Sequence, residues 1–344
     1  MSEGSGGAGT TSARLPRIAV AMGDPAGIGA EIVVGALRDP EVFRACVPVV
    51  IGDAGVLGRS PGWRGAEPRI VRIGDVEEAH PEVGVIHLID LANVPGSLRL
   101  AVASAEGGRA SVEYLAKGVE LALAGRVEAV VSAPLNKEAM KKAGFHYLDE
   151  YEYLSDLCGV DEYTVLMVTR RFTLASVTLH VPMREMANLI TKDRVLMAIR
   201  HSDRAARAAG TPNPRIGVAA LNPHAGEGGT LGTEEVEAIR PAVEAARAEG
   251  IDAHGPYPAD TFFMTAREPA YDVYVGMYHD QGRIALKLLE FGRATTMAEG
   301  LPVLFCTVGH GTAYDIVGKG VARWENMRDT ILLAARRAVT RRQE

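Results

Sequence analysis

Short β-branched runs alternate with alanine-rich helical patterns along most of this chain, and this alternation limits the fold more than any other feature. The runs predict strands at residues 17–22, 47–52, 84–90, 129–132, 163–168, 175–179, 215–221, 273–277 and 301–306. Helical patterns lie between them at 30–38, 105–124, 189–209, 233–249 and 322–340. Strands that alternate with helices of this length are typical of α/β proteins with a largely parallel sheet. At 344 residues the chain is too long for one compact core, so we expect two domains.

Composition and charge exclude several classes of protein. The net charge of −6, without a dense basic patch, argues against nucleic-acid binding. Residues 2–12 lack the apolar segment of a secretory signal, and no stretch approaches the roughly 20 continuous apolar residues of a membrane span. Cys46, Cys158 and Cys306 are too widely spaced to suggest a disulfide framework or a CxxC site. We therefore expect a cytoplasmic protein with no nucleic-acid or membrane partner, preceded by a disordered tail at 1–14.

Three histidines, His180, His224 and His279, each follow an apolar β-like run. In open α/β sheets, ligands bind outside the carboxyl ends of the strands, so side chains at those ends converge. Three imidazoles with carboxylates nearby make a divalent metal site that keeps positions open for substrate. The sequence therefore indicates a metal-assisted enzyme.

Further polar residues surround these histidines in the sequence. Asp280 directly follows His279, and Lys287 lies one or two helical turns later. A metal would lower the pKa of a nearby lysine, so Lys287 is a candidate general base, with a solvated surface lysine as an equal alternative. Asp260 sits on a rigid Pro-rich turn and, with Asp280, is a candidate for orienting the reacting groups.

Two glycine-containing segments could contact a nucleotide. The segment 23–31, GDPAGIGAE, could favour an anion at a helix N-terminus, although a tight strand-to-helix turn explains it equally well. The segment 310–320 resembles the loop of isopropylmalate and isocitrate dehydrogenases that receives the adenosine part of NAD. That resemblance implies NAD contacts at the following residues: His310, Gly311, Thr312, Ala313 and Asp315. This segment has no arginine cluster for a 2′-phosphate, so NAD is expected over NADP.

Taken in order, the segments GDPAGIGAE, SAPLNK, LNPHAGEGGTLGTEE, GPYPADT, MYHDQG, FGR and HGTA resemble the 4-hydroxythreonine-4-phosphate dehydrogenase (PdxA) family. The resemblance implies an isocitrate/isopropylmalate-dehydrogenase-like fold of two α/β domains with an active-site cleft between them. It also implies NAD, and a homodimer with a shared active site. A divalent metal, with zinc as first choice and magnesium or manganese as alternatives, would be held by His180, His224 and His279. We expect His279 to come from the opposite subunit.

The same resemblance suggests domain boundaries. Residues 15–130 with 300–344 would form the NAD-binding domain, and residues 131–299 the metal-binding and dimerisation domain.

Several expected substrate contacts depart from the family pattern. Residues 149–152 read Asp-Glu-Tyr-Glu where the family has Gly-His-Thr-Glu, Thr296 replaces an asparagine, and Phe305 replaces an arginine. The residues expected at the substrate are Glu150, Tyr151, Thr296, Phe305 and Arg293. A phosphate needs cations and hydrogen-bond donors, so the phosphate site of the family looks dismantled. The role of Glu150 stays open.

These observations predict an NAD- and divalent-metal-dependent oxidation of the secondary alcohol of a hydroxy acid or diol carboxylate, with or without decarboxylation afterwards. One alternative is the vitamin B6 pathway activity itself with a rearranged phosphate site. The other is a catalytically silent protein that binds a metal and a nucleotide. Lys287, Asp260 and Asp280 argue against silence, because mere metal binding needs only the histidines.

Overall fold

The computed structural model describes residues 14–61, 68–290 and 292–341, so all but the last residue of the expected tail at 1–14 lies outside the described residues. The described strands form one twelve-stranded sheet in the order β3-β4-β2-β1-β5-β12-β11-β6-β7-β10-β8-β9. Their bounds, in that order, are Arg69–Arg72, Val85–Asp90, Val47–Gly52, Arg17–Ala21, Ala129–Ser132, Phe305–Val308, Thr295–Glu299, Thr164–Val168, Thr173–Ser176, Val273–Gly276, Ile216–Ala219 and Ala253–Tyr257.

The sheet consists of two parallel halves joined by an antiparallel seam. The strands from β3 to β12 are parallel, and so are those from β7 to β9. Between them, β11 runs antiparallel to both β12 and β6, and β6 runs antiparallel to β7. The central strand β1 is buried along its whole length, as expected of a parallel strand that is covered on both faces.

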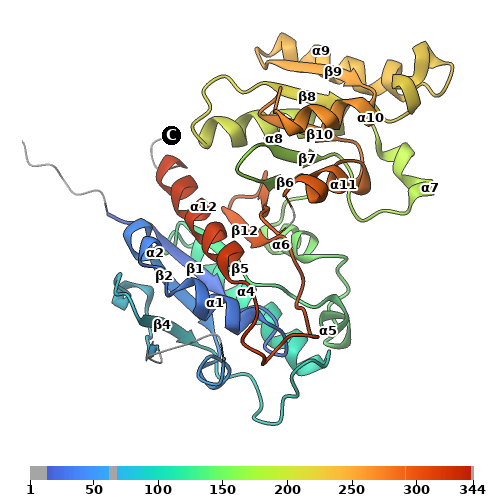
Figure 1. Ribbon diagram of the computed structural model, residues 1–344. Helices are drawn as coiled ribbons and strands as arrows, with labels where there is room; N and C mark the ends of the chain where they lie inside the picture. The colour runs from blue at the N-terminus through green and yellow to red at the C-terminus, as the bar shows by residue number, and fades with distance from the viewer. Residues whose placement is uncertain (1–13, 62–67, 291, 342–344) are drawn as a thin grey trace, which may run out of the picture.

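Helices cover both halves of the sheet. The α-helices α1 to α12 span Gly29–Ala36, Pro40–Ala45, Ala54–Leu57, Ala105–Leu123, Lys137–Lys142, Glu150–Cys158, Met183–Met186, Lys192–Ala208, Arg240–Ala248, Ala259–Phe262, His279–Glu290 and Glu325–Arg341. Short 3₁₀ segments η1, η2, η3 and η5 span Val76–Glu78, Ala187–Leu189, Pro223–Gly229 and Phe263–Arg267, and a π-helical turn, η4, spans Glu235–Ile239. Figure 1 shows the C-terminal helix α12 packed against the half of the sheet that contains the first strands, where it contacts α1, α2 and β1.

The α/β class is as predicted, and every predicted run overlaps an observed strand or helix. Three strands were missed: the half-exposed edge strand β3, the Gly- and Pro-containing edge strand β9, and β11. The strand predicted at 301–306 begins only at Phe305, because residues 300–304 connect the antiparallel neighbours β11 and β12. In the described part of the chain, no helix combines the length and apolar character needed to span a membrane.

Candidate functional site

His180 and His279 lie together at the carboxyl ends of two neighbouring strands. Strands β7 and β10 are parallel, with Ser176 opposite Gly276. Each histidine follows its strand by three or four residues, and the two imidazole centroids are 5.6 Å apart. Two of the three strand-end histidines therefore lie close together, while their role as metal ligands stays a prediction.

Each of these imidazoles is held by a carboxylate. The Nδ1 of His180 contacts Oδ2 of Asp149, and the Nδ1 of His279 lies 2.6 Å from Oδ1 of Asp280. A carboxylate that accepts from Nδ1 fixes the ring orientation and leaves the lone pair on Nε2. Both rings are thus arranged as metal-binding histidines commonly are.

Asp149 also begins the helix α6. Its Oδ1 accepts hydrogen bonds from the backbone N–H groups of Tyr151 and Glu152, at 2.9 and 3.0 Å, while its other oxygen faces His180. Burial alone would raise the pKa of Asp149, but the bonds from His180 and from the N–H of Glu152 hold it below its ordinary value. Asp149 is therefore a charged group that serves both the helix and the imidazole.

His224 does not join this pair within one chain. Strand β8 neighbours β10, so its carboxyl end lies at the same edge of the sheet. However, residues 224–228 all have positive φ angles between 42° and 75°, and this left-handed turn leaves His224 exposed. In the described ranges, no group of three or more His, Cys, Asp or Glu side chains is placed to hold a metal ion.

The contribution of His279 from an opposite subunit stays a prediction. Within one chain, the rings of His180 and His279 adjoin. His224, in contrast, is placed at the surface by the left-handed turn.

The loop that carries His224 is anchored by a buried carboxylate. Glu235, with no exposed surface, accepts from the backbone N–H groups of Leu221 and Asn222 through Oε1, at 2.8 and 2.7 Å. Its Oε2 accepts from the Asn222 side chain at 2.9 Å. Non-glycine residues in the left-handed region are strained, so this anchor holds an unfavourable turn in place.

The predicted apolar contacts face inward rather than toward a ligand. Tyr151 and Phe305 are 5% and 0% exposed, and their ring centroids are 5.9 Å apart. Tyr151 also hydrogen-bonds Thr296, which is 4% exposed. These residues fill the core beneath the site, and their contact with a substrate stays a prediction. Glu150 remains half-buried near Asp149, and burial raises its pKa, with the Asp149 charge adding to the effect.

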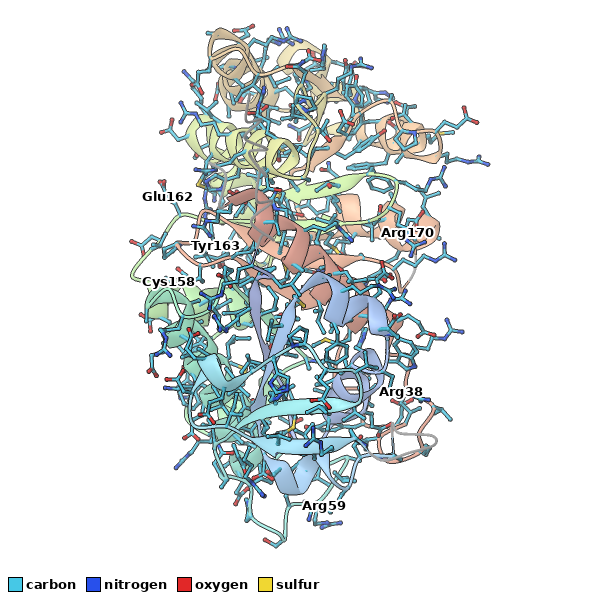
Figure 2. The ribbon with its side chains drawn as sticks, turned by 90° about the vertical axis from the view of Figure 1, so that its left-hand side faces the viewer. Arg38, Arg59, Cys158, Glu162, Tyr163 and Arg170 are labelled. Atoms are coloured by element: carbon cyan, nitrogen blue, oxygen red, sulfur yellow. The ribbon has the colours of Figure 1, made fainter. Side chains whose placement is uncertain are left out.

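Arg293 lies away from the histidine pair. It lines a cavity of about 210 Å³ with Arg170, next to Val168 at the end of β6. The start of β6 neighbours Ser176, whereas Val168 pairs with Thr173 at the opposite end. Figure 2 shows Tyr163, just before β6, and Arg170, just after it, on opposite sides of the molecule. The structure therefore does not bring Arg293 to the substrate region.

The predicted catalytic side chains are all accessible. Lys287 is exposed on α11, two turns after His279. Asp260 and Asp280 line one apolar groove, which also contains the exposed residues Ile284 and Leu288. The structure links Asp280 to His279 but shows no contact of Asp260 or Lys287 with the histidine pair.

Two residues of this region were missed by sequence reasoning. Asp149 could have been found from its spacing, because an Asp three residues before a Glu at a helix start is a capping pattern. Arg283 lies one turn after His279 on α11, so the two share a helix face. Its Nε is buried without a hydrogen-bond partner among the residues that the structure describes.

The glycine-rich turn at 23–31 and the loop at 310–320 pack against each other. Tyr314 donates a 2.5 Å hydrogen bond to the buried Asp24, and the N–H of Ile28 donates to the carbonyl of Thr312 at 3.1 Å. A Cβ on Gly27 would lie 2.8 Å from that of Thr312, so only glycine permits this approach. A Cβ on Gly311, in contrast, would meet nothing within 4 Å, so this part of the loop is open.

Comparison with known proteins places the chain in a family. The model of the family described as "Pyridoxal phosphate biosynthetic protein PdxA" matches residues 44–334. A 4-hydroxythreonine-4-phosphate dehydrogenase of Trichlorobacter lovleyi is 41% identical over 332 residues, which cover 95% of this chain and 98% of that protein. The crystal structure of a 4-hydroxythreonine-4-phosphate dehydrogenase from Burkholderia phymatum has a TM-score of 0.80 at 41% identity, over 94% and 98% of the two chains. A terephthalate 1,2-cis-dihydrodiol dehydrogenase from Burkholderia xenovorans has a TM-score of 0.66 at 28% identity, over 94% and 98%. The chain therefore belongs to the PdxA family and is a dehydrogenase of that family.

Proposed function

We propose that this protein oxidises the secondary alcohol of a hydroxy acid, with NAD as hydride acceptor and a divalent cation at the His180–His279 pair. The pair itself is the observation that carries the proposal, because two adjacent imidazoles are each oriented by a carboxylate at the edge of the sheet. A scaffold histidine would not need this arrangement.

The donor set fits a divalent metal of the zinc type. Imidazole nitrogens suit zinc, and the remaining ring nitrogens of His180 and His279, the Nε2 atoms, could be joined by His224 of a second copy. Such a cation supplies Lewis-acid polarisation of an alcohol oxygen and its neighbour. We accordingly propose a homodimer in which both chains complete each site.

The loop at 310–320 fits a nucleotide. Its open stretch at Gly311 and the half-buried His310 lie beside the turn that leads into α1. We propose that Thr312, Ala313 and Asp315 complete this NAD contact. Bound NAD would accept the hydride.

The chain's own side chains would manage the proton and the orientation of the site. Asp149 and Asp280 hold the two imidazoles. Lys287, which projects from the same helix as His279, would take the alcohol proton on Nζ as the hydride leaves. Asp260 would position groups along the groove it shares with Asp280. Within this scheme 131–299 would be the metal-binding part of the chain, and 15–130 with 300–344 the NAD-binding part.

The substrate is expected to lack phosphate. The residues at the family's phosphate positions are here a carboxylate, Glu150, and the buried Tyr151, Thr296 and Phe305. Losing several charge-assisted donors, each contributing about 1.5–3 kcal/mol, weakens a dianion by orders of magnitude. A second candidate is the 4-hydroxythreonine-4-phosphate activity named for the relatives, which the 41% identity over 95% of the chain favours.

A substrate panel tests both candidates. The chelator-treated protein is supplied with zinc, magnesium or manganese and NAD, and NADH formation is followed with 4-hydroxythreonine 4-phosphate, unphosphorylated hydroxy acids and a cis-dihydrodiol carboxylate. We expect metal-dependent turnover with a higher kcat/KM for an unphosphorylated compound. A clear preference for the phosphorylated compound would establish the second candidate, and metal-independent turnover would refute the role of the histidine pair.

A further inference from the structure

Arg283 is a partly buried guanidinium that no protein group neutralises directly. Its Nε is fully buried without a hydrogen-bond partner, and Arg283 takes part in none of the ion pairs found among the described residues. Arg17 also has an unpartnered Nε, but its guanidinium pairs with Glu77 at 2.6 Å. A buried donor without a partner lowers the stability of the folded protein. A side chain that retains such a donor without structural benefit is therefore a candidate for a functional role.

The surroundings of Arg283 place it at the candidate active site. It follows His279 by one turn and precedes Lys287 by one turn, so the three residues form a stripe along α11. Burial lowers the pKa of Arg283, while Tyr151, Asp149 and Glu150 are near enough for their charges to oppose that effect. The guanidinium therefore faces the space between α11 and the start of α6.

We propose that Arg283 binds the carboxylate of the substrate through the Nη donors of its guanidinium, since its Nε is fully buried. This inference rests on the proposed dehydrogenase function and specifies which end of its substrate the protein recognises. A guanidinium presents parallel N–H donors that match the two oxygens of a carboxylate. The guanidinium projects from α11, the helix that carries His279. A hydroxy acid whose carboxylate is held by Arg283 would therefore direct its hydroxyl end along the stripe toward the histidine pair.

The charges nearby favour a monoanion over a dianion. Asp149, Glu150 and Asp280 all act on Arg283 electrostatically. A carboxylate would neutralise the single charge of Arg283, whereas a phosphate dianion would leave excess negative charge next to three acidic side chains.

Binding measurements on the full-length, metal-loaded protein without NAD test this proposal. Titration calorimetry compares 4-hydroxythreonine, 4-hydroxythreonine 4-phosphate and inorganic phosphate against wild type and the variants R283M, R283K and R283A. Methionine keeps most of the apolar stem of arginine without its charge. Arg336, an exposed arginine on α12, provides the control R336M.

We expect R283M to weaken 4-hydroxythreonine binding about 10- to 100-fold, from the loss of a charge-assisted pair of hydrogen bonds. R283K should recover part of that loss, millimolar guanidinium should restore binding to R283A, and R336M should match wild type. The Tm of R283M should equal or exceed that of wild type, because the unpartnered Nε is removed. A purely structural arginine would instead show a lower Tm and no rescue by guanidinium.

Several outcomes would overturn the proposal. These are wild-type affinity in R283M, a dissociation constant of 4-hydroxythreonine above about 10 mM in wild type, or an R283M effect confined to the phosphorylated compound and inorganic phosphate. The last result would identify a phosphate site. Failure of the proposed function is recognised separately: the binding difference would persist while no compound yields NADH. If R283M turned over substrate with an unchanged KM, the proposed dehydrogenase function would be supported and the role of Arg283 in substrate binding would be refuted.

Discussion

Asp149 both caps the helix α6 and holds the imidazole of His180. We expect D149N and D149A to differ in which of these two functions they lose. Asparagine is as good an N-cap as aspartate, so D149N should keep the bonds to Tyr151 and Glu152 and leave stability nearly unchanged. Its amide group, however, would donate toward His180 and favour the tautomer with the proton on Nε2. Alanine removes the cap and costs about 1 kcal/mol of stability, but it lets the imidazole choose either tautomer.

The magnitudes follow from the same contacts. Loss of a carboxylate that orients a metal-binding histidine typically weakens metal affinity about 10- to 100-fold, or about 1.4–2.7 kcal/mol. We expect this loss to be at least as large in D149N as in D149A, although D149N is the more stable protein. Zinc affinity is measured by competition with a chromophoric chelator, and stability by thermal unfolding of the metal-free protein. If D149N bound zinc like wild type, or if both losses simply followed stability, the assignment of His180 as a ligand oriented by Asp149 would be wrong.

Three further perturbations test other parts of the structure. Burial lowers the pKa of His201 from 6.5 to about 4. The free energy of unfolding that is present above about pH 6.5 is therefore lost as the pH falls toward 4, by about 2 kcal/mol at pH 5. Denaturation of wild type and H201N at both ends of this range should show the smaller pH dependence in the variant. E235Q places an amide donor against the Asn222 side chain and should lower stability by about 1–3 kcal/mol in denaturant titrations, with E237Q on the same turn as the neutral control. NAD should give a higher kcat/KM than NADP, and a tenfold preference for NADP would contradict the cofactor assignment at 310–320.

The sequence predicts the fold well where hydrophobic pattern and chain connectivity agree. Parallel strands such as β1 and β2 are continuous apolar runs, and they were found with nearly the observed bounds. Strand β11, Thr295–Glu299, was missed although it is central, because its threonines, alanine and glutamate show neither alternation nor a continuous apolar run. Its position in the sheet depends on pairing with β12, which is close to it in the sequence, and with β6, which is far from it.

The candidate site was predictable to the level of strand ends but not of side-chain direction. The order β7-β10-β8 brings the strand ends before all three histidines to one edge, as expected. The left-handed turn at 224–228 then turns His224 away, and no sequence pattern fixes that direction except its glycines. Tyr151 and Phe305 show a second limit, because an aromatic residue at a substrate position can either face the ligand or fill the core beneath it.

The antiparallel seam also determines how the two halves of the sheet can move. Because β11 is hydrogen-bonded to β12 on one side and to β6 on the other, the halves are joined through a continuous ladder as well as through chain crossings. Relative motion must therefore twist or shear that ladder, so its free-energy cost rises with amplitude, unlike motion about a flexible linker. Such a connection behaves elastically: small-amplitude flexing is cheap, and a displaced half experiences a restoring force toward the resting geometry. The stiffness of three short strands, β12, β11 and β6, would then set how far the two halves can move.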